Sequence, residues 1–181
     1  MNLKQLFGAP GDPMPWREAM QCNPHFGESW GYNNNCQRCC FTYELRRRGY
    51  KVIARPRLSS SSARDPVDEL REIRRVIDGG RWISIPAEDQ ADFIRDQIRA
   101  AGPSRWMIWV MHKNRNYAHL IVVELMPPGL MSSGFFEWID PQINCAVSSD
   151  YLDKFDAKGM RMLRMDGAEF SYLVKWVAEK E

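Results

Sequence analysis

Residues with the chemistry of a covalent hydrolase stand at three widely separated positions in the sequence. Cys36 follows three asparagines (33–35) and precedes a run that predicts a helix ending before Gly49. A thiol at a helix N-terminus lies at the positive end of the helix dipole, which favours the reactive thiolate. Such a nucleophile needs a base and a group that orients the base, and His119 and Asp140 offer both. The sequence therefore contains candidates for a cysteine nucleophile, its base and the group that orients the base.

The position of His119 within an apolar run has two interpretations. Strand alternation places it on one face with Ile121 and Val123, where a lone histidine is most simply a satisfied core residue. The next apolar run ends at Asp140, directly before Pro141. If the two strands pair as a hairpin, the aspartate comes beside the histidine and fixes its tautomer. An Asx-type turn before the proline is the alternative role for this aspartate.

The apolar patterns that surround these residues predict mainly helices in the first half of the chain and an antiparallel sheet in the second half. This order is typical of an α+β fold. The four prolines of residues 1–34 predict an irregular arm, with one short helical turn near Trp16. Periodicity and end signals predict helices over 36–48, 65–78, 86–101 and 168–180. Alternating and buried apolar runs predict strands at 50–55, 105–111, 117–125, 135–139 and 161–165.

Composition excludes several classes of protein. The net charge of +2 is too small to indicate a nucleic-acid or membrane-surface partner. No stretch approaches the roughly 18 apolar residues of a membrane span, and the first residues lack the apolar core of a signal peptide. The five cysteines are an odd, scattered set, which favours reduced thiols over a disulfide framework.

Several motifs together resemble one known family. They are the Asn-Cys start of the first helix (35–39), its continuation (43–50), Ala118-His119 and the Ile-Asp-Pro-Gln strand end (139–142). In these positions the chain resembles the papain-fold toxins, glutamine-deamidase-like domains of bacterial polymorphic toxins and of some phage head-associated proteins. The resemblance implies a papain-like α+β fold in which an N-terminal nucleophile helix packs on an antiparallel sheet. The resemblance covers roughly residues 22–175, whereas the prolines and the start of the first helix lead us to divide the chain into an irregular N-terminal arm (1–34) and a papain-like catalytic domain (35–181).

The resemblance also implies a reaction and a set of site residues. The catalytic triad falls on Cys36, His119 and Asp140, which would deamidate glutamine side chains of a target protein to glutamate through a thioester. For the oxyanion we expect the Cys36 N–H together with a side-chain amide of Asn34 or Gln142. No metal or organic cofactor is required by this chemistry.

The small net charge leads us to expect no nucleic-acid or membrane partner. The resemblance alone implies the other partners, which are a protein substrate that presents a glutamine and an immunity protein. It further implies delivery as part of a larger secreted or phage-borne protein, with activity in the cytoplasm of the target cell.

Cys39 is the alternative nucleophile. Papain-like proteases also carry a Cys-x-x-Cys before this helix, and in them the second cysteine attacks. We favour Cys36 because it follows the cap directly, and the effect of the helix terminus fades within one turn. The Asn-Cys pair of the toxin family points the same way.

Three further interpretations compete with the deamidase. Cys22, His25, Cys36 and Cys39 have spacings that a structural zinc ion accepts, which would make the chain a zinc-stabilised binding module. The same triad could instead hydrolyse peptide bonds, because both reactions share the acyl-enzyme. The basic run of residues 46–48 could serve a binding module without catalysis, although such a run is usually a solvated helix face.

Overall fold

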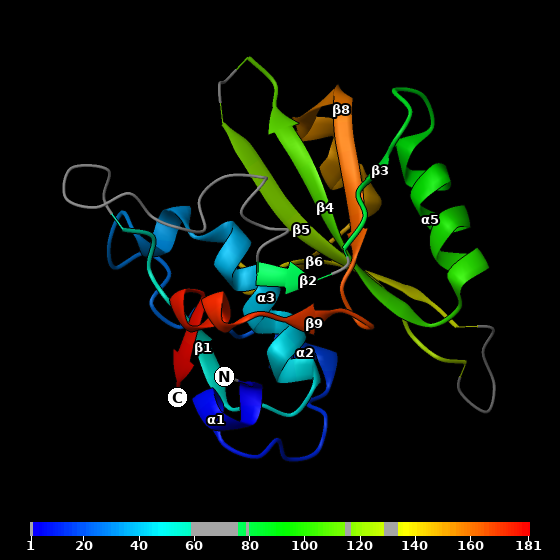
Figure 1. The fold of residues 1–181 in the computed structure, drawn as a ribbon. Helices are drawn as coiled ribbons and strands as arrows, with labels where there is room; N and C mark the ends of the chain where they lie inside the picture. The colour runs from blue at the N-terminus through cyan, green and yellow to red at the C-terminus, as the bar shows by residue number, and fades with distance from the viewer. Residues whose placement is uncertain (1, 59–75, 79, 115–116, 129–133) are drawn as a thin grey trace. The chain divides into compact units, whose positions relative to one another are not determined.

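The computed structural model describes residues 2–58, 76–78, 80–114, 117–128 and 134–181, and these form two compact units (Figure 1). The first, here called the helix unit, comprises Met1–Gly80, Pro141–Cys145 and Ala168–Glu181. The second, the sheet unit, comprises Arg81–Asp140 and Ala146–Gly167. No helix among the described residues is both long and apolar enough to cross a membrane.

In its described residues, the helix unit is built around helix α3 and two short strand pairs. Strand β1 pairs antiparallel with β10, and β2 pairs antiparallel with β9. Its elements, in chain order, are α1 (Leu3–Phe7), α2 (Trp16–Ala19), η1 (Tyr32–Asn34), α3 (Cys36–Arg47), β1 (Val52–Ala54), β2 (Ile77–Asp78), β9 (Glu169–Phe170), η3 (Tyr172–Trp176) and β10 (Ala178–Lys180).

Helix α3 begins at the predicted cysteine and is a buried helix. Every residue from Arg38 to Arg46 is buried, so it lacks the solvated face of a surface helix. Gly49, just past its end, has a φ of 88°, and a β-carbon there would lie 2.2 Å from the Gly11 carbonyl oxygen. The predicted end of the helix is therefore confirmed, and glycine is required there for both backbone conformation and space.

The predicted C-terminal helix over 168–180 is wrong. This segment forms β9, the 3-10 turn η3 and β10. Leu173 and Val174 are buried as the apolar spacing predicted, but a single 3-10 turn suffices to bury them, and the Ser171 side chain caps it by accepting from the Leu173 N–H. The backbone on either side pairs with β2 and β1, strands that lie about a hundred residues earlier in the chain and compete with the helix for these N–H and C=O groups.

The sheet unit contains the antiparallel sheet that the sequence predicted. One of its strands, β8 (Phe155–Arg164), is longer than the strand predicted at 161–165. The sheet has the order β3-β8-β4-β5-β6-β7, in which β4-β5-β6 forms a meander. The elements are β3 (Ile83–Ser84), α5 (Gln90–Ala101), β4 (Ser104–His112), β5 (Ala118–Leu125), β6 (Phe136–Asp140), β7 (Cys145–Val147), η2 (Ser149–Lys154) and β8 (Phe155–Arg164).

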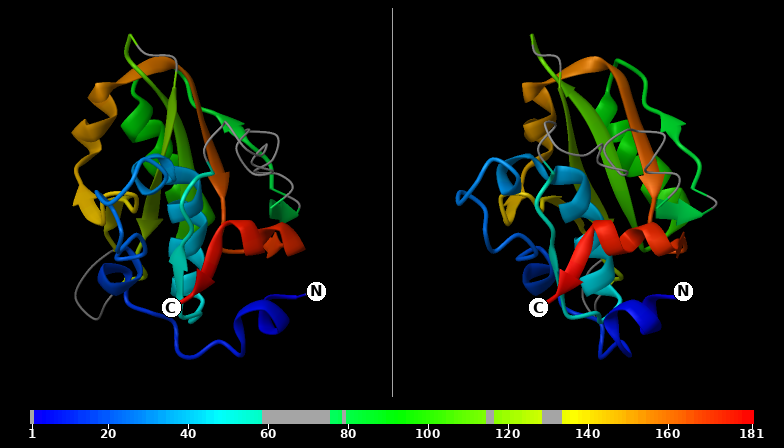
Figure 2. Two further views of the ribbon diagram at one scale, coloured as in Figure 1. Left: turned by 90° about the vertical axis from the view of Figure 1, so that its left-hand side faces the viewer. Right: turned by 60° about the vertical axis from the view of Figure 1, so that its left-hand side comes forward.

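Helix α5 covers one face of this sheet, as Figures 1 and 2 show, and the core of the unit lies there. The helix contributes Ile94 and Ile98, and alternate residues of the strands meet them. The helix starts at Gln90 rather than at the expected Pro86, because Asp89 has a left-handed backbone with φ of 50°. The strand members of this core are Trp106, Ile108, Val110, Ile121, Val123, Trp138, Phe155, Met160 and Met162.

Two other predictions have different outcomes. Most of the helix predicted over 65–78 lies outside the described residues, and its last apolar residue, Ile77, belongs to strand β2 instead. The division into an arm (1–34) and a domain (35–181) stays a prediction. Within residues 1–34 the structure has three short helical segments, one of them at the predicted Trp16 turn.

Candidate active site

Cys36 is the first residue of α3, and its side chain is partly exposed. Asn35 occupies the cap position, but the expected side-chain cap is absent. Its amide is instead buried, donating to the Arg55 carbonyl at 3.1 Å and accepting from the Cys39 thiol at 3.1 Å. The asparagine therefore anchors the start of the helix to the core beneath it, and it leaves the first N–H groups of α3 uncapped by this side chain.

Cys39 lies one turn further into the helix and has the surroundings of a structural thiol. It is fully buried, and its Sγ donates to the Asn35 Oδ1. Burial, and then a contact with the Cys22 side chain, raise the pKa of the Cys39 thiol well above its usual value. A thiol that is inaccessible and held protonated is a poor nucleophile, so the local environment favours Cys36 over Cys39.

His119 and Asp140 lie together in the sheet unit. His119 is in β5 and Asp140 ends β6, one residue past the last paired position of the two strands, Val122 with Ile139. The His119 Nε2 is 2.7 Å from the Asp140 Oδ2, and the two residues are 8% and 1% exposed. When the Asp140 carboxylate is ionised it can only accept, which requires the proton of this hydrogen bond to be on Nε2. The hairpin geometry expected from the sequence is present.

Two aromatic residues that the sequence did not single out complete this pair. The Tyr151 hydroxyl, on η2, donates to the same Asp140 Oδ2 at 2.8 Å. Phe155 stacks on the His119 ring, with centroids 5.9 Å apart and an interplanar angle of 15°. No spacing rule connects a tyrosine on an irregular segment to an aspartate eleven residues earlier, so no signal pointed to it. The pair is thus held from the carboxylate side and from one face of the imidazole.

The two expected amide donors behave differently. The Gln142 Nε2 donates to the Asn33 carbonyl, and Gln142 is 7% exposed, so the structure places this side chain against the turn that precedes Cys36. Asn34 is exposed, and its Nδ2 donates to the Trp30 carbonyl at 2.8 Å. Asn33 acts in the turn, where its Oδ1 accepts from the Gly27 N–H. Of the two expected donors, Gln142 is therefore the better candidate for an oxyanion hole beside Cys36.

The four residues considered for zinc do not form a metal site. Cys22 is buried and its Sγ donates to the Cys39 carbonyl at 3.4 Å, whereas His25 contacts the Glu28 carboxylate at 3.0 Å. Within the part of the chain that the structure describes, no three His, Cys, Asp or Glu side chains are arranged to hold a metal ion.

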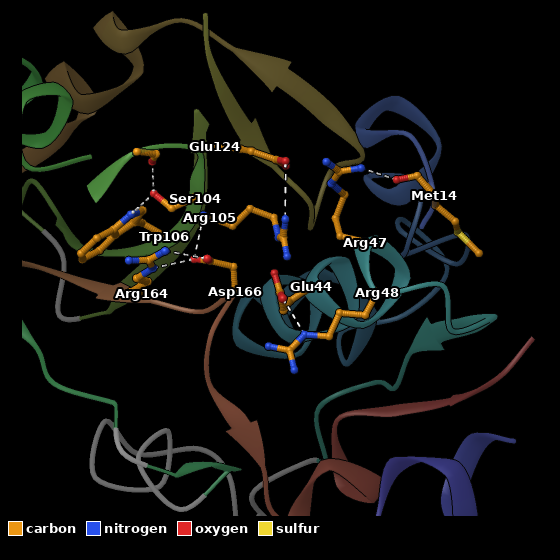
Figure 3. A network of polar contacts seen from close by, with 11 residues as sticks. Met14, Glu44, Arg47, Arg48, Ser104, Arg105, Trp106, Glu124, Arg164 and Asp166 are labelled. Carbon is orange, nitrogen blue, oxygen red and sulfur yellow. Dashed lines mark hydrogen bonds and ion pairs between the residues drawn. The ribbon is translucent and has the colours of Figure 1, made fainter. Parts of the chain in front are cut away.

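The basic run of residues 46–48 is structural rather than a surface for binding. Arg46 is 4% exposed and donates to the Val52 carbonyl at 2.9 Å. Arg48 forms an ion pair of 2.7 Å with the buried Glu44, and Arg47 donates to a backbone carbonyl at residue 14, both drawn in Figure 3. These contacts explain the run, and they remove the observation that had suggested a binding module.

Comparison with known protein families gives one match that covers most of the chain. The family described as papain fold toxin 1, glutamine deamidase, matches residues 34–144. The chain belongs to this family. The matched segment spans every site residue expected from the sequence, from Asn34 through Gln142. Membership supports the role of a glutamine deamidase toxin at the level of the family.

The fold agrees with a solved structure. The chain is similar to the Salmonella effector SpvD, G161 variant, with a TM-score of 0.56 and 12% identity. The similarity covers 86% of this chain and 80% of that one. At this identity the likeness concerns the fold, and it agrees with the papain-like α+β fold of the family. A comparison with curated proteins finds none that matches.

Proposed function

We propose that this protein is a cysteine-dependent amidohydrolase that converts glutamine side chains of a target protein to glutamate. The hydrogen-bonded pair of His119 and Asp140 carries the proposal, because a buried imidazole oriented by a carboxylate is the base that a thiol nucleophile requires. The partly exposed Cys36 at the start of α3 supplies the thiol. Membership in a glutamine deamidase family names the substrate group.

The first half of the reaction forms a thioester. Because Nε2 of His119 is engaged with Asp140, Nδ1 is the nitrogen that takes the proton from Cys36. The thiolate attacks the carboxamide carbon, and the carbonyl oxygen becomes an oxyanion. Asp140 remains ionised and stabilises the imidazolium that results. Collapse of the tetrahedral intermediate breaks the C–N bond, and ammonia leaves with the proton from His119.

Two donors are proposed for the oxyanion: the backbone N–H of Cys36 and the side-chain amide of Gln142. An amide nitrogen carries two N–H groups, so a glutamine can hold a carbonyl with one and donate to a substrate oxygen with the other. Only Pro141 separates Gln142 from Asp140 in the chain. Such donors matter because they act on charge that develops only in the transition state.

The second half of the reaction releases the product. Water attacks the thioester carbon, with His119 as the general base, and the Cys36 thiolate leaves and regains its proton. The product is glutamate, so each turnover adds one negative charge to the target. A new charge in an interface or active site of the target disrupts it through desolvation and repulsion, in the same way as other charge-changing modifications.

A proteome-wide assay tests the proposed function. Desalted bacterial and human cell extracts are incubated with the wild-type protein, Cys36→Ala or His119→Ala, and peptides are then examined by mass spectrometry. We expect glutamine-to-glutamate conversion and ammonia release with the wild type alone. New peptide termini without conversion would identify a protease, and equal conversion by all three proteins would contradict a cysteine-dependent deamidase.

Delivery and partners are proposed from the family. A toxin domain carried into a cell acts on a protein there, and the producing cell requires an immunity protein that blocks it. We expect expression of the wild type in a bacterial cytoplasm to arrest growth and expression of Cys36→Ala to be tolerated. Equal toxicity of the variant would indicate harm through binding alone.

A further inference from the structure

Asn23 is a fully buried polar residue that belongs neither to the proposed triad nor to the proposed oxyanion donors. It lies in the N-terminal region that the sequence predicted as an irregular arm, between Cys22 and Pro24. A buried amide is costly unless its hydrogen bonds are satisfied, so its partners explain why an asparagine is tolerated there. All of the partners described below belong to the helix unit.

The side chain of Asn23 joins the two segments that carry the proposed oxyanion donors. Its Nδ2 donates to the Gln142 carbonyl at 2.8 Å and to the Tyr32 carbonyl at 3.0 Å. It also forms a reciprocal amide pair with Asn35, with N–O distances of 3.2 and 3.3 Å. One side chain thus contacts the backbone of Gln142, the turn before α3 and the residue that immediately precedes Cys36.

The backbone of Asn23 is held as firmly as its side chain. The Asn144 side chain accepts from the Asn23 N–H at 3.0 Å and donates to the Asn23 carbonyl at 2.8 Å. Asn144 has a φ of 53°, a left-handed conformation that asparagine adopts more readily than most residues. The Gln21 Nε2 adds a bond to the Asn144 carbonyl at 3.2 Å. Residues 21–23 and 142–144 are therefore clamped together from both sides.

We infer that Asn23 is a positioning residue for the oxyanion hole: it fixes Gln142 relative to the start of α3. This inference rests on the proposed function for its catalytic meaning. Asn23 acts by holding Gln142 in place against the segment that contains Asn35. A displacement of a catalytic group by about 1 Å lowers the rate by as much as about a hundredfold. Losing the shared amide leaves several buried carbonyls without their donor, and the two segments then shift to recover one.

The variant Asn23→Ala tests the inference through the rate of turnover. With a synthetic peptide copied from the most modified extract protein as substrate, we expect kcat to fall about tenfold to a hundredfold and KM to change little. Alkylation of Cys36 by iodoacetamide, located by peptide mapping, should keep its wild-type rate because it forms no oxyanion. A parallel loss of alkylation would show that Asn23 acts on the thiol and would overturn the inference, as would an unchanged kcat.

A double-mutant cycle with Gln142→Ala tests the path of the effect. If Asn23 acts through Gln142, the double variant is no slower than Gln142→Ala alone. Multiplied losses in the double variant would overturn this path. The matched control is Arg46→Ala, which removes a buried side chain at the other end of α3. We expect it to lower the melting temperature but to leave kcat unchanged below that temperature.

Hydrogen exchange decides the structural half of the inference independently of turnover. In Asn23→Ala, peptides covering residues 31–36 and 141–145 should exchange faster than in the wild type, and in Arg46→Ala they should not. Unchanged exchange at both segments would overturn the inference even if the wild type proved inactive. Failure of the proposed function is recognised separately, as wild-type ammonia release no greater than that of Cys36→Ala.

Discussion

At the residue scale, two of the three thiols of α3, those of Cys36 and Cys39, differ in accessibility although they are one helical turn apart. Cys36 is partly exposed, whereas Cys39 is fully buried and bonded to Asn35. The difference favours different roles for the two cysteines of this Cys-x-x-Cys motif, with Cys36 as the proposed nucleophile. Cys36 is the first residue of α3, whereas Cys39 lies within the run from Arg38 to Arg46 in which every residue is buried.

The variant Cys39→Ser separates these roles. A serine hydroxyl has nearly the shape of the thiol and can still donate to the Asn35 Oδ1, so we expect activity within about threefold of the wild type. Cys36→Ser, the matched control, should abolish turnover because an alkoxide does not form where a thiolate does. Ammonia release measures both. If Cys39→Ser lost activity while keeping its melting temperature, Cys39 rather than Cys36 would be identified as the nucleophile.

Tyr151 provides a second residue-scale prediction. Its hydroxyl donates to the Asp140 oxygen that also holds His119, so Tyr151→Phe removes one of the bonds that fix the carboxylate. A hydrogen bond to a charged group contributes enough that we expect kcat to fall about tenfold, with KM unchanged. Tyr172→Phe is the control, because that tyrosine is 54% exposed. Equal kcat in both variants would mean that His119 and Asp140 hold each other without help.

The sequence indicates some of these residues and not others, for a physical reason. Cys36, His119 and Asp140 have reactive side chains at positions marked by a helix start, by strand alternation and by a strand end. Asn23 and Tyr151 have common side chains in irregular segments, and their importance comes from contacts made only after folding. Their catalytic roles, like those of the triad, stay predictions until they are measured.

At the element scale, the end of α3 depends on one glycine. Gly49→Ala adds a β-carbon 2.2 Å from the Gly11 carbonyl oxygen at a backbone φ of 88°. The left-handed backbone alone costs about 1–2 kcal/mol for an L-residue, and the clash adds to that. Gly8→Ala is the control, since Gly8 has the same φ and no atom within 4 Å of the added carbon. Urea denaturation should show Gly49→Ala to be the less stable variant, and equal stability would contradict the close contact.

The elements that the sequence predicts well are those with enough residues to show a period. Helix α3 and strands β4, β5 and β6 were expected within a few residues of their ends. Strands β2 and β9 have two residues each, too few for alternation, and they exist because they pair with each other across the chain. The same long-range pairing explains why residues 168–180 do not form the predicted helix. Local periodicity predicts which side chains are buried. Pairing with distant segments determines which secondary structure the backbone adopts.

At the scale of the whole molecule, acid stability depends on a polar network in the sheet unit. Asp166 accepts from the Arg164 side chain at 3.0 and 2.9 Å and from the Arg105 N–H at 3.1 Å, as Figure 3 shows. Burial opposes ionisation of Asp166, but the hydrogen bonds from Arg164 and Arg105 and the charges of both arginines lower its pKa overall. The network thus ties β4 to the segment after β8 through an ionised carboxylate.

The sign of its pH dependence follows from the lowered pKa. The ionised form contributes stability above the unfolded-state pKa of about 3.9, and this contribution is lost as the pH falls through the lower folded value. We expect Asp166→Asn to melt at a lower temperature than the wild type near neutral pH. The difference should shrink on acidification below about pH 4. Thermal melts across this range measure it, and a difference independent of pH would contradict the role of the charge.

The activity proposed for the whole molecule depends on one covalent bond, between Cys36 and the carboxamide carbon of the substrate glutamine. The substrate glutamine is replaced in a peptide by its diazoketone analogue, which alkylates a bound nucleophile with loss of nitrogen, and the labelled residue is identified by peptide mapping. We expect the label to lie on Cys36 and His119→Ala to be labelled much more slowly. A label on Cys39, or labelling of Cys36 that is unaffected by the loss of His119, would contradict this proposal.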